Sequence, residues 1–186
     1  MGSFENDKKQ TLSKKDKSKK QSFDTRIKKL LEIINKKEDY YTTSSCAGRI
    51  MLLTVEKLKP DTKWIFVTHK KLKKKEIEKI LHNLPQNKVY FKQESFIIHV
   101  ACRSLNHAQK FLDAVSGVRR KGILSTRGKI VVEVIGSPHF ETIIAKDGKL
   151  LVTSSYLNHL INEANSRLSE NWKKISWLEK NLGEKI

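Results

Sequence analysis

The sequence predicts an α+β fold in which helices pack on a mixed β-sheet. Helix-like and strand-like segments alternate without a repeating β-α-β period. No strand-like run leads into a glycine-rich turn and a helix, with an acidic residue ending the next strand, as a Rossmann-type nucleotide site requires. The 186 residues suffice for one domain with a sizeable core. We therefore expect a single domain over residues 23–186, preceded by a basic, largely flexible segment at residues 1–22.

The first predicted helix begins near Asp24, which can serve as its N-cap. Its apolar residues recur at i, i+3, i+4 and i+7, as on one face of an amphipathic helix. They are Ile27, Leu30, Leu31 and Ile34. The segment before it contains seven lysines and little that could be buried. It is either a solvated tail or a basic arm in which Lys17, Lys19 and Lys20 order on RNA.

The remaining elements follow from runs of β-branched and aromatic residues and from helical spacing. The predicted strands cover residues 50–55, 64–69, 89–92, 96–101, 122–125, 129–135 and 139–145. The last three are expected to form successive hairpins, because turn signals separate them at Arg127-Gly128 and Gly136-Ser137-Pro138. The predicted helices are a lysine-rich one around residues 73–84, one that Ser104 can cap, and a long C-terminal one over residues 155–182.

A formal net charge of +18 on 186 residues favours a polyanionic partner, RNA first among them. The apolar runs are far shorter than the roughly 18 residues that span a bilayer, and no signal-peptide pattern opens the chain, so we expect the protein in the cytoplasm. Cys46 and Cys102 stand alone, which argues against a disulfide framework and against a zinc site. We therefore expect no metal.

The segment from Tyr41 to Ile50 combines hydroxyls, small side chains and one arginine at the entry to a strand. Such a loop can cradle an anion, since small residues let a ligand approach the main chain. Gly48 permits a positive φ, and Arg49 can hold a carboxylate or a phosphate with two hydrogen bonds. Ser44, Ser45, Gly48 and Arg49 are thus candidate cofactor-binding residues. The plain alternative is an ordinary loop.

The run Ser44-Ser45-Cys46-Ala47-Gly48-Arg49 closely resembles the Ser-Ser-Cys-Ser-Gly-Arg signature of the tRNA wybutosine-synthesising methyltransferases, in their archaeal type. Further segments resemble that family's blocks in the same order. They are residues 16–20 with Asp24, residues 64–69, residues 98–103, residues 117–123, Tyr156-Leu157 and residues 163–165. The resemblance covers residues 12–182. The chain departs from the family's pattern at Ala47, at Lys19-Lys20-Gln21 and at Lys121.

This resemblance implies an S-adenosylmethionine-dependent tRNA methyltransferase. Its implied substrate is a 4-demethylwyosine-type tricyclic guanosine, methylated at N4, next to the anticodon of tRNA-Phe in wyosine and wybutosine biosynthesis. We expect a monomer or a weak dimer. Two other interpretations of the charge stay open: a non-catalytic basic RNA-binding module, and a scaffold on ribosomal RNA.

Methyl transfer from a sulfonium is an in-line displacement, so positioning is the main task of the enzyme. If the attacking nitrogen must lose a proton, Asp24 and His99 are the candidate catalytic bases. Asp24 can instead be only a helix cap. His99 alternates with apolar neighbours, so it can instead be a structural histidine with satisfied hydrogen bonds.

Four residues are candidates for contacts with RNA besides the lysines of the N-terminal segment. Arg119, Arg120 and Lys121 stand where a hairpin is expected to begin, and they either contact phosphates or form a solvated turn. Tyr41 could stack on a splayed base, or it packs in the core.

Overall fold

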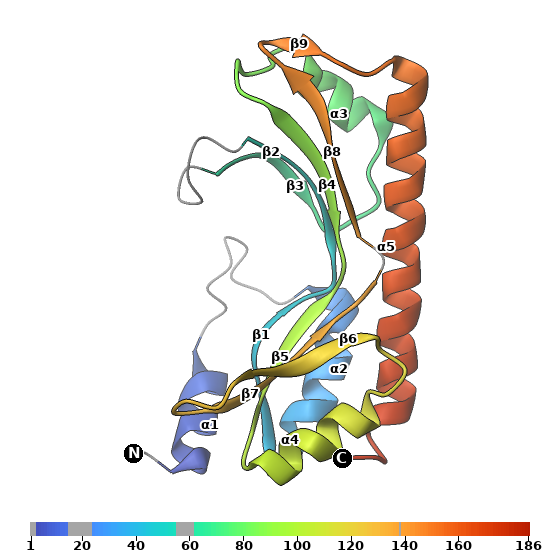
Figure 1. The fold of residues 1–186 in the computed structure, drawn as a ribbon. Helices are drawn as coiled ribbons and strands as arrows, with labels where there is room; N and C mark the ends of the chain where they lie inside the picture. The colour runs from blue at the N-terminus through green and yellow to red at the C-terminus, as the bar shows by residue number, and fades with distance from the viewer. Residues whose placement is uncertain (1–2, 15–23, 55–61, 138) are drawn as a thin grey trace. The chain divides into compact units, whose positions relative to one another are not determined.

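The protein folds into five helices and two antiparallel sheets among residues 3–14, 24–54, 62–137 and 139–186, the residues that this computed structural model describes (Figure 1). The prediction of an α+β fold without Rossmann topology is confirmed. The expected mixed sheet is wrong, because every strand pair in the described part of the chain is antiparallel. Parallel pairing needs a long crossover between neighbouring strands, which the short connections of this chain rarely provide.

The contacts of the chain group into two compact units. Unit 1 comprises Met1–Ala47, Phe96–Ser137 and Asn171–Ile186, and unit 2 comprises Gly48–Ser95 and Pro138–Glu170. Each unit is assembled from separate stretches of sequence. The expectation of a single domain over residues 23–186 stays a prediction, since compactness alone does not decide whether the units fold together.

Unit 1 contains a four-stranded sheet, here called sheet A, with the strand order β1-β5-β7-β6. Its strands are β1 (Tyr40–Cys46), β5 (Ile97–Cys102), β7 (Ile130–Ile135) and β6 (Arg120–Ser125). Its helices are α1 (Phe4–Ser13), α2 (Thr25–Asn35), α4 (Leu105–Ala114) and the C-terminal part of α5 (Ser154–Leu182). Apolar residues of α2, α4 and α5 form one core cluster with Ile98, Val100 and Val132 of the sheet. One face of sheet A, its core face, is thus covered by helices.

Unit 2 contains a five-stranded sheet, sheet B, with the order β3-β2-β4-β8-β9. The strands are β2 (Arg49–Thr54), β3 (Lys63–Thr68), β4 (Val89–Glu94), β8 (Phe140–Lys146) and β9 (Lys149–Leu150), accompanied by α3 (Lys74–Leu81). The side chain of Asn165 on α5 accepts a hydrogen bond from Leu72 N at 2.7 Å and donates to Leu72 O at 2.9 Å. This pair of bonds ties the segment before α3 to α5.

The expected hairpin between residues 129–135 and 139–145 is wrong. The first strand, β7, pairs with β5 and β6 in sheet A, whereas the second, β8, pairs with β4 and β9 in sheet B. The turn signal at Gly136 therefore marks the passage of the chain from one sheet to the other. Turn chemistry is local, but the choice of a strand's partner is not.

Helix starts agree closely with the sequence. Asp24 Oδ1 accepts from Arg26 N at 3.2 Å and caps α2, and Ser104 Oγ accepts from His107 N at 3.4 Å and caps α4. The N-terminal segment differs from the expectation of flexibility, since residues 4–13 form α1 with Ser3 as its N-cap. Phe4 anchors this helix, because its ring centroid lies 5.1 Å from that of Tyr41.

Gly136 occupies a site in unit 1 that has no room for a side chain. A Cβ there would lie 2.5 Å from Asn171 Oδ1 and 2.5 Å from Phe96 Cδ1, both buried. We expect Gly136→Ala to lower the free energy of unfolding by about 1–3 kcal/mol, the usual cost of overpacking, as measured by urea denaturation. Gly122→Ala is the matched control, because a Cβ at Gly122 meets no atom within 4 Å. Equal stabilities of the two variants would contradict the close packing of Gly136.

Candidate functional site

Sheet A has a second face, opposite its core, and this open face carries the polar residues of the site. Cross-strand partners share a face of a sheet, and the register places Ser44 opposite His99 and His99 opposite Glu133. Gly122 continues this row on β6. A Cβ added to Gly122 would meet nothing within 4 Å, so the row ends in open space.

A β-bulge in β1 aims Ser44 at this row. The register shifts between Thr42 and Ser44, so Thr43 is the extra residue. Thr42 faces the core side, where its backbone N donates to Asn35 Oδ1 of α2 at 2.8 Å. Ser45 pairs with Ile98, a core residue, and therefore points away from the open face. Of the two predicted serines, the structure brings only Ser44 together with His99.

His99 is held by a carboxylate. Its Nε2 lies 2.8 Å from Glu133 Oε2, and the two side chains are 21% and 29% exposed. In the neutral imidazole the carboxylate favours the tautomer with hydrogen on Nε2, since it can only accept. Nδ1 then keeps its lone pair. This is the arrangement in which a histidine acts as a general base with an acidic residue orienting it.

Glu133 is the residue that the sequence analysis missed. It is the lone charged residue in the apolar strand from Ile130 to Ile135. An acidic residue on the exposed side of such a strand is a detectable signal, but its partner on a distant strand is not visible without the sheet register.

Asp24 lies on a different element from this row. It caps α2, whose apolar residues pack on the core face of sheet A. The described role of Asp24 is therefore the helix cap, and its role as a catalytic base stays a prediction.

Arg49 belongs to a charged cluster on sheet B. Its Nε donates to Glu94 Oε2 at 2.6 Å, and its guanidinium carbon lies 4.6 Å from the ring centroid of Trp64. Lys92 Nζ lies 3.2 Å from carboxylate oxygens of both Glu94 and Glu141. Stacking and ion pairing together fix the orientation of the guanidinium.

The electrostatics of this cluster keep its members charged. Burial raises the pKa of the Glu94 carboxyl, but the charges and hydrogen bonds of Arg49 and Lys92 outweigh burial, so the pKa lies below its ordinary value. Burial acts to lower the pKa of Lys92, and hydrogen bonds to Glu94 and Glu141 raise it above its ordinary value. Cation and carboxylate therefore coexist here at neutral pH.

Gly48 precedes Arg49 in a conformation that favours glycine, with φ at 95°. Its carbonyl oxygen lies 3.2 Å from His69 Nδ1, which can donate to it. The main chain at the entry to β2 is therefore held in place without a side chain at residue 48. Ser44 and Ser45 belong to unit 1, and Gly48 and Arg49 to unit 2.

The predicted RNA contacts divide into three groups. Arg119 and Arg120 are exposed, as phosphate contacts need to be. Lys121 is half-buried, and its Nζ donates to Val118 O at 2.9 Å and to Ser116 O at 3.3 Å. Its ammonium thus supports the turn after α4. Lys17, Lys19 and Lys20 lie outside the described residues.

Tyr41 does not present its ring to a ligand. Only 1% of it is exposed, with Phe4 packed against it and Lys129 Nζ 5.9 Å from its centroid. The ring is buried between sheet A and α1, and a contact of Tyr41 with a base stays a prediction. Tyr40 is buried too, and burial raises its pKa to about 12.

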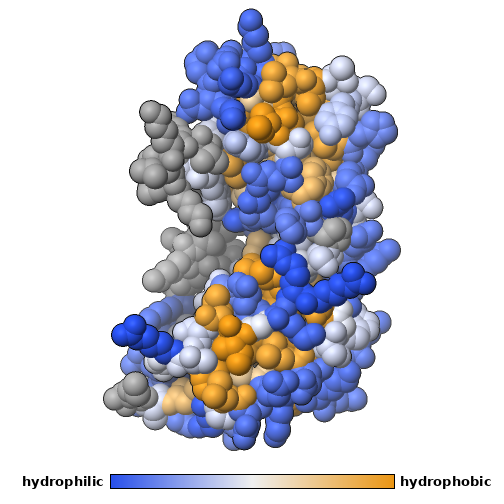
Figure 2. All heavy atoms as spheres, viewed as in Figure 1, coloured by the Kyte–Doolittle hydropathy of each residue, from blue (hydrophilic) through white to orange (hydrophobic). Residues whose placement is uncertain are grey.

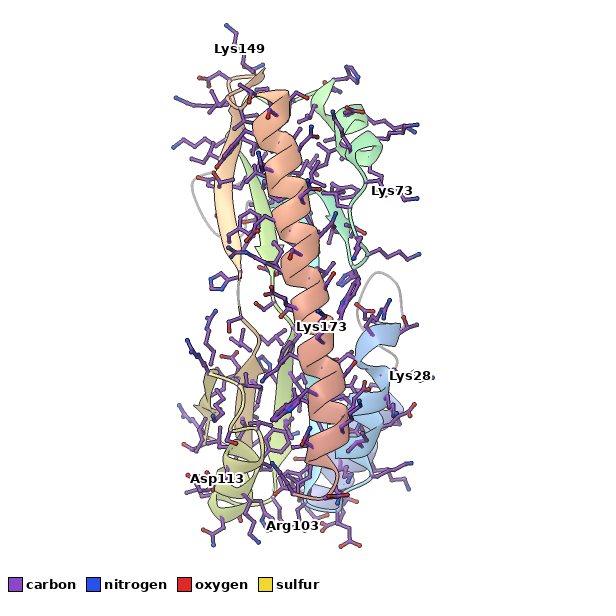
Figure 3. All side chains as sticks on the ribbon, turned by 90° about the vertical axis from the view of Figure 1, so that its right-hand side faces the viewer. Lys28, Lys73, Arg103, Asp113, Lys149 and Lys173 are labelled. Atoms are coloured by element: carbon purple, nitrogen blue, oxygen red, sulfur yellow. The ribbon has the colours of Figure 1, made fainter. Side chains whose placement is uncertain are left out.

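Charge alone does not select a binding face. Figure 3 shows Lys28 on α2 and Lys173 on α5, two exposed lysines on helices that cover the core face of sheet A. Strand β6 also carries exposed apolar residues, Ile123 at 43% and Leu124 at 55% exposure, and Figure 2 shows hydrophobic areas between hydrophilic ones on that part of unit 1. The polar row of sheet A and the Arg49 cluster therefore indicate functional residues better than the distribution of charge does.

Comparison with known proteins identifies the family. A family model described as Methyltransferase TYW3 matches residues 6–184. The chain belongs to this family. It is thus a methyltransferase, and the TYW3 enzymes use S-adenosylmethionine as methyl donor.

Several relatives of this TYW3 methyltransferase are known. A tRNA wybutosine-synthesizing protein 3 homolog from Xenopus laevis is 36% identical over 184 residues, which cover 93% of the chain and 72% of the relative. The tRNA(Phe) 7-((3-amino-3-carboxypropyl)-4-demethylwyosine(37)-N(4))-methyltransferase of Methanocaldococcus jannaschii is 31% identical over 172 residues, 89% of each chain. The PH1069 protein of Pyrococcus horikoshii has the same fold, with a TM-score of 0.87, 29% identity and coverage of 96% and 95%.

The residues of the Arg49 cluster fit the methyl donor of the TYW3 family. Its methionyl part carries a carboxylate and an ammonium, and the paired Arg49 and Glu94 offer one charge of each sign. Gly48 is buried, and its positive φ, which favours glycine, sets the path of the main chain into Arg49. Neither a helix able to cross a bilayer nor a metal-binding group of His, Cys, Asp or Glu occurs in the part of the chain that the structure describes.

Proposed function

We propose that this TYW3 methyltransferase methylates N4 of a 4-demethylwyosine-type guanosine next to the anticodon of tRNA(Phe). The observation that carries the proposal is the pair of His99 and Glu133 on the open face of sheet A, in one row with Ser44 of the family's signature. A nitrogen that carries a hydrogen before methylation must lose it, and this row holds an oriented base. The names of the archaeal relatives supply the substrate.

Each residue of the row has its own task in this proposal. His99 Nδ1 accepts the proton from N4, Glu133 positions the imidazole, and the Ser44 hydroxyl hydrogen-bonds the tricyclic base. S-adenosylmethionine, when bound, supplies an electrophilic methyl group on a sulfonium. Arg49 and Glu94 of sheet B offer a positive and a negative charge to its methionyl carboxylate and ammonium.

The direct test uses tRNA from cells that lack this protein. Incubation with S-adenosylmethionine carrying a labelled methyl group should place the label on a wyosine-type nucleoside, detected by mass spectrometry after digestion. Parallel tRNA with and without the aminocarboxypropyl arm identifies the preferred substrate. Label on any other nucleoside, or none, would overturn the proposal.

Arg119 and Arg120 contact tRNA phosphates in this proposal. We expect the double variant Arg119→Ala, Arg120→Ala to weaken tRNA binding and to lower the slope of log affinity against log salt by about one for each lost phosphate contact. Filter binding at several salt concentrations measures both quantities.

Lys121→Met is the matched control for this pair, because its ammonium is engaged with Ser116 and Val118 carbonyls. It should retain the salt slope and lose about 0.5–1.5 kcal/mol of unfolding free energy per hydrogen bond. A salt slope that falls for Lys121→Met but not for the double variant would reverse these roles.

A further inference from the structure

Trp64 is exposed in a way that packing does not explain. It lies on β3, an edge strand of sheet B, and 49% of it is exposed. Tryptophan is mostly buried in folded proteins, and an exposed one on a sheet face points to a ligand or a partner. In the site described above, Trp64 contributes only its contact with the Arg49 guanidinium.

The register of sheet B shows what surrounds Trp64. It pairs with Leu53, Leu53 pairs with Tyr90, and Tyr90 pairs with Ile143, so these four residues form one row on one face. Ile143 is 36% exposed at the end of the row. The face therefore carries two rings on one row.

The next rows of the same face carry an exposed apolar residue and the cations Lys92 and Arg49, which are paired with Glu94 and Glu141. Val67 is 37% exposed, and Lys92 lies two strands away from it in the same row, opposite Glu141. Arg49 lies on the same face as the first residue of β2, with its guanidinium carbon 4.6 Å from the Trp64 ring centroid. An exposed ring on an antiparallel sheet offers unpaired nucleotides a surface for stacking, and the net charge of +18 attracts their phosphate backbone.

We propose that Trp64 stacks an unpaired base of the tRNA substrate on this face of sheet B. The proposal rests on the proposed tRNA methylation and names one contact between the enzyme and its RNA substrate. A small-molecule site buries most of its ligand, whereas Trp64 is half exposed on an edge strand, where a nucleotide chain can pass. Arg49, stacked on the indole and paired with Glu94, keeps the ring oriented before RNA arrives.

The test compares Trp64→Leu with Trp64→Phe, which keeps an aromatic face. Binding is measured for an anticodon stem-loop and for an RNA duplex without unpaired bases. We expect Trp64→Leu to weaken stem-loop binding about tenfold or more, Trp64→Phe to restore most of the affinity, and duplex binding to stay unchanged. Tyr156→Leu, which removes another exposed aromatic of unit 2 (47% exposed), should bind both RNAs as wild type does.

Two results would overturn this inference. One is unchanged stem-loop affinity in Trp64→Leu. The other is a loss of S-adenosylmethionine affinity in Trp64→Leu, measured by calorimetry without RNA, that is as large as the loss of RNA affinity or larger. That result would assign Trp64 to contact with the adenine or to the support of Arg49. Nucleoside mass spectrometry of the wild-type product separates the proposed methylation from the proposed stacking. If the wild type forms a methylated wyosine-type base and Trp64→Leu has unchanged RNA affinity, only the stacking is contradicted.

Discussion

Replacing His99 by alanine should lower kcat for methyl transfer by about 10²–10⁴-fold, the usual contribution of a positioned general base. The reason is the lone pair on Nδ1, which the hydrogen bond of 2.8 Å to Glu133 leaves available. Single-turnover assays with saturating tRNA and methyl donor measure this loss.

Glu133→Gln distinguishes positioning from simple packing. The amide keeps the size of the side chain but can donate as well as accept, so the tautomer of His99 is no longer fixed. We expect a lower kcat with little change in KM and in thermal stability. His159→Ala, at an exposed position of α5, is the control and should retain wild-type turnover. Near wild-type turnover in both His99→Ala and Asp24→Asn would rule out either residue as the base.

Replacing Arg49 by alanine should weaken S-adenosylmethionine binding by about 10- to 100-fold in the absence of RNA. Hydrogen bonds to a charged group are worth about 1.5–3 kcal/mol, and the variant also loses the partner of Glu94. Calorimetry with the free methyl donor measures the change. Arg49→Lys should recover only part of the affinity, because an ammonium lacks the planar fork of the guanidinium.

Arg49→Ala also distinguishes the two anions that Arg49 could bind, the carboxylate of the methyl donor and a phosphate of the tRNA. Unchanged affinity for the methyl donor together with weaker tRNA binding would assign Arg49 to a phosphate. The double variant Arg49→Ala, Glu94→Gln serves as the matched control, because it removes the carboxylate that Arg49→Ala leaves without its arginine. If the double variant binds the methyl donor as wild type does, neither charge holds the methionyl group.

The features that the sequence predicts well are local. The caps at Asp24 and Ser104 and the apolar stripes of α2 and α5 depend on residues within a few positions of one another. The segment from Ser44 to Arg49 stands out as a motif, but the expected loop is wrong in its first part, because Tyr40–Cys46 form strand β1 by pairing with the distant β5. The assignment of β7 and β8 to different sheets depends on contacts between distant strands, so the turn signal at Gly136 could not reveal it.

In the candidate site, too, local features are predictable from the sequence, whereas contacts between distant strands are not. His99 was a candidate from its residue type and spacing, but the partner that makes it a plausible base, Glu133, lies 34 positions away and becomes visible only through the pairing of β5 with β7. The burial of Tyr41 could not be predicted for a related reason. Its ring is covered by Phe4, a residue of an N-terminal segment whose composition indicated flexibility.

The bulge in β1 has a consequence for how the signature is counted. In an even strand, two residues on one face stand two apart, yet Tyr41 and Ser44, which share the open face, stand three apart. Thr43 is thus an extra residue that determines which of the following residues of β1 face each side of sheet A. A chain that lacked Thr43 would show an almost identical motif in a sequence alignment. Its β1 strand, however, would alternate regularly and would lack the local twist that the extra residue introduces. The number of residues between Tyr41 and Ser44, and not only their identity, therefore determines which side chains lie on the open face.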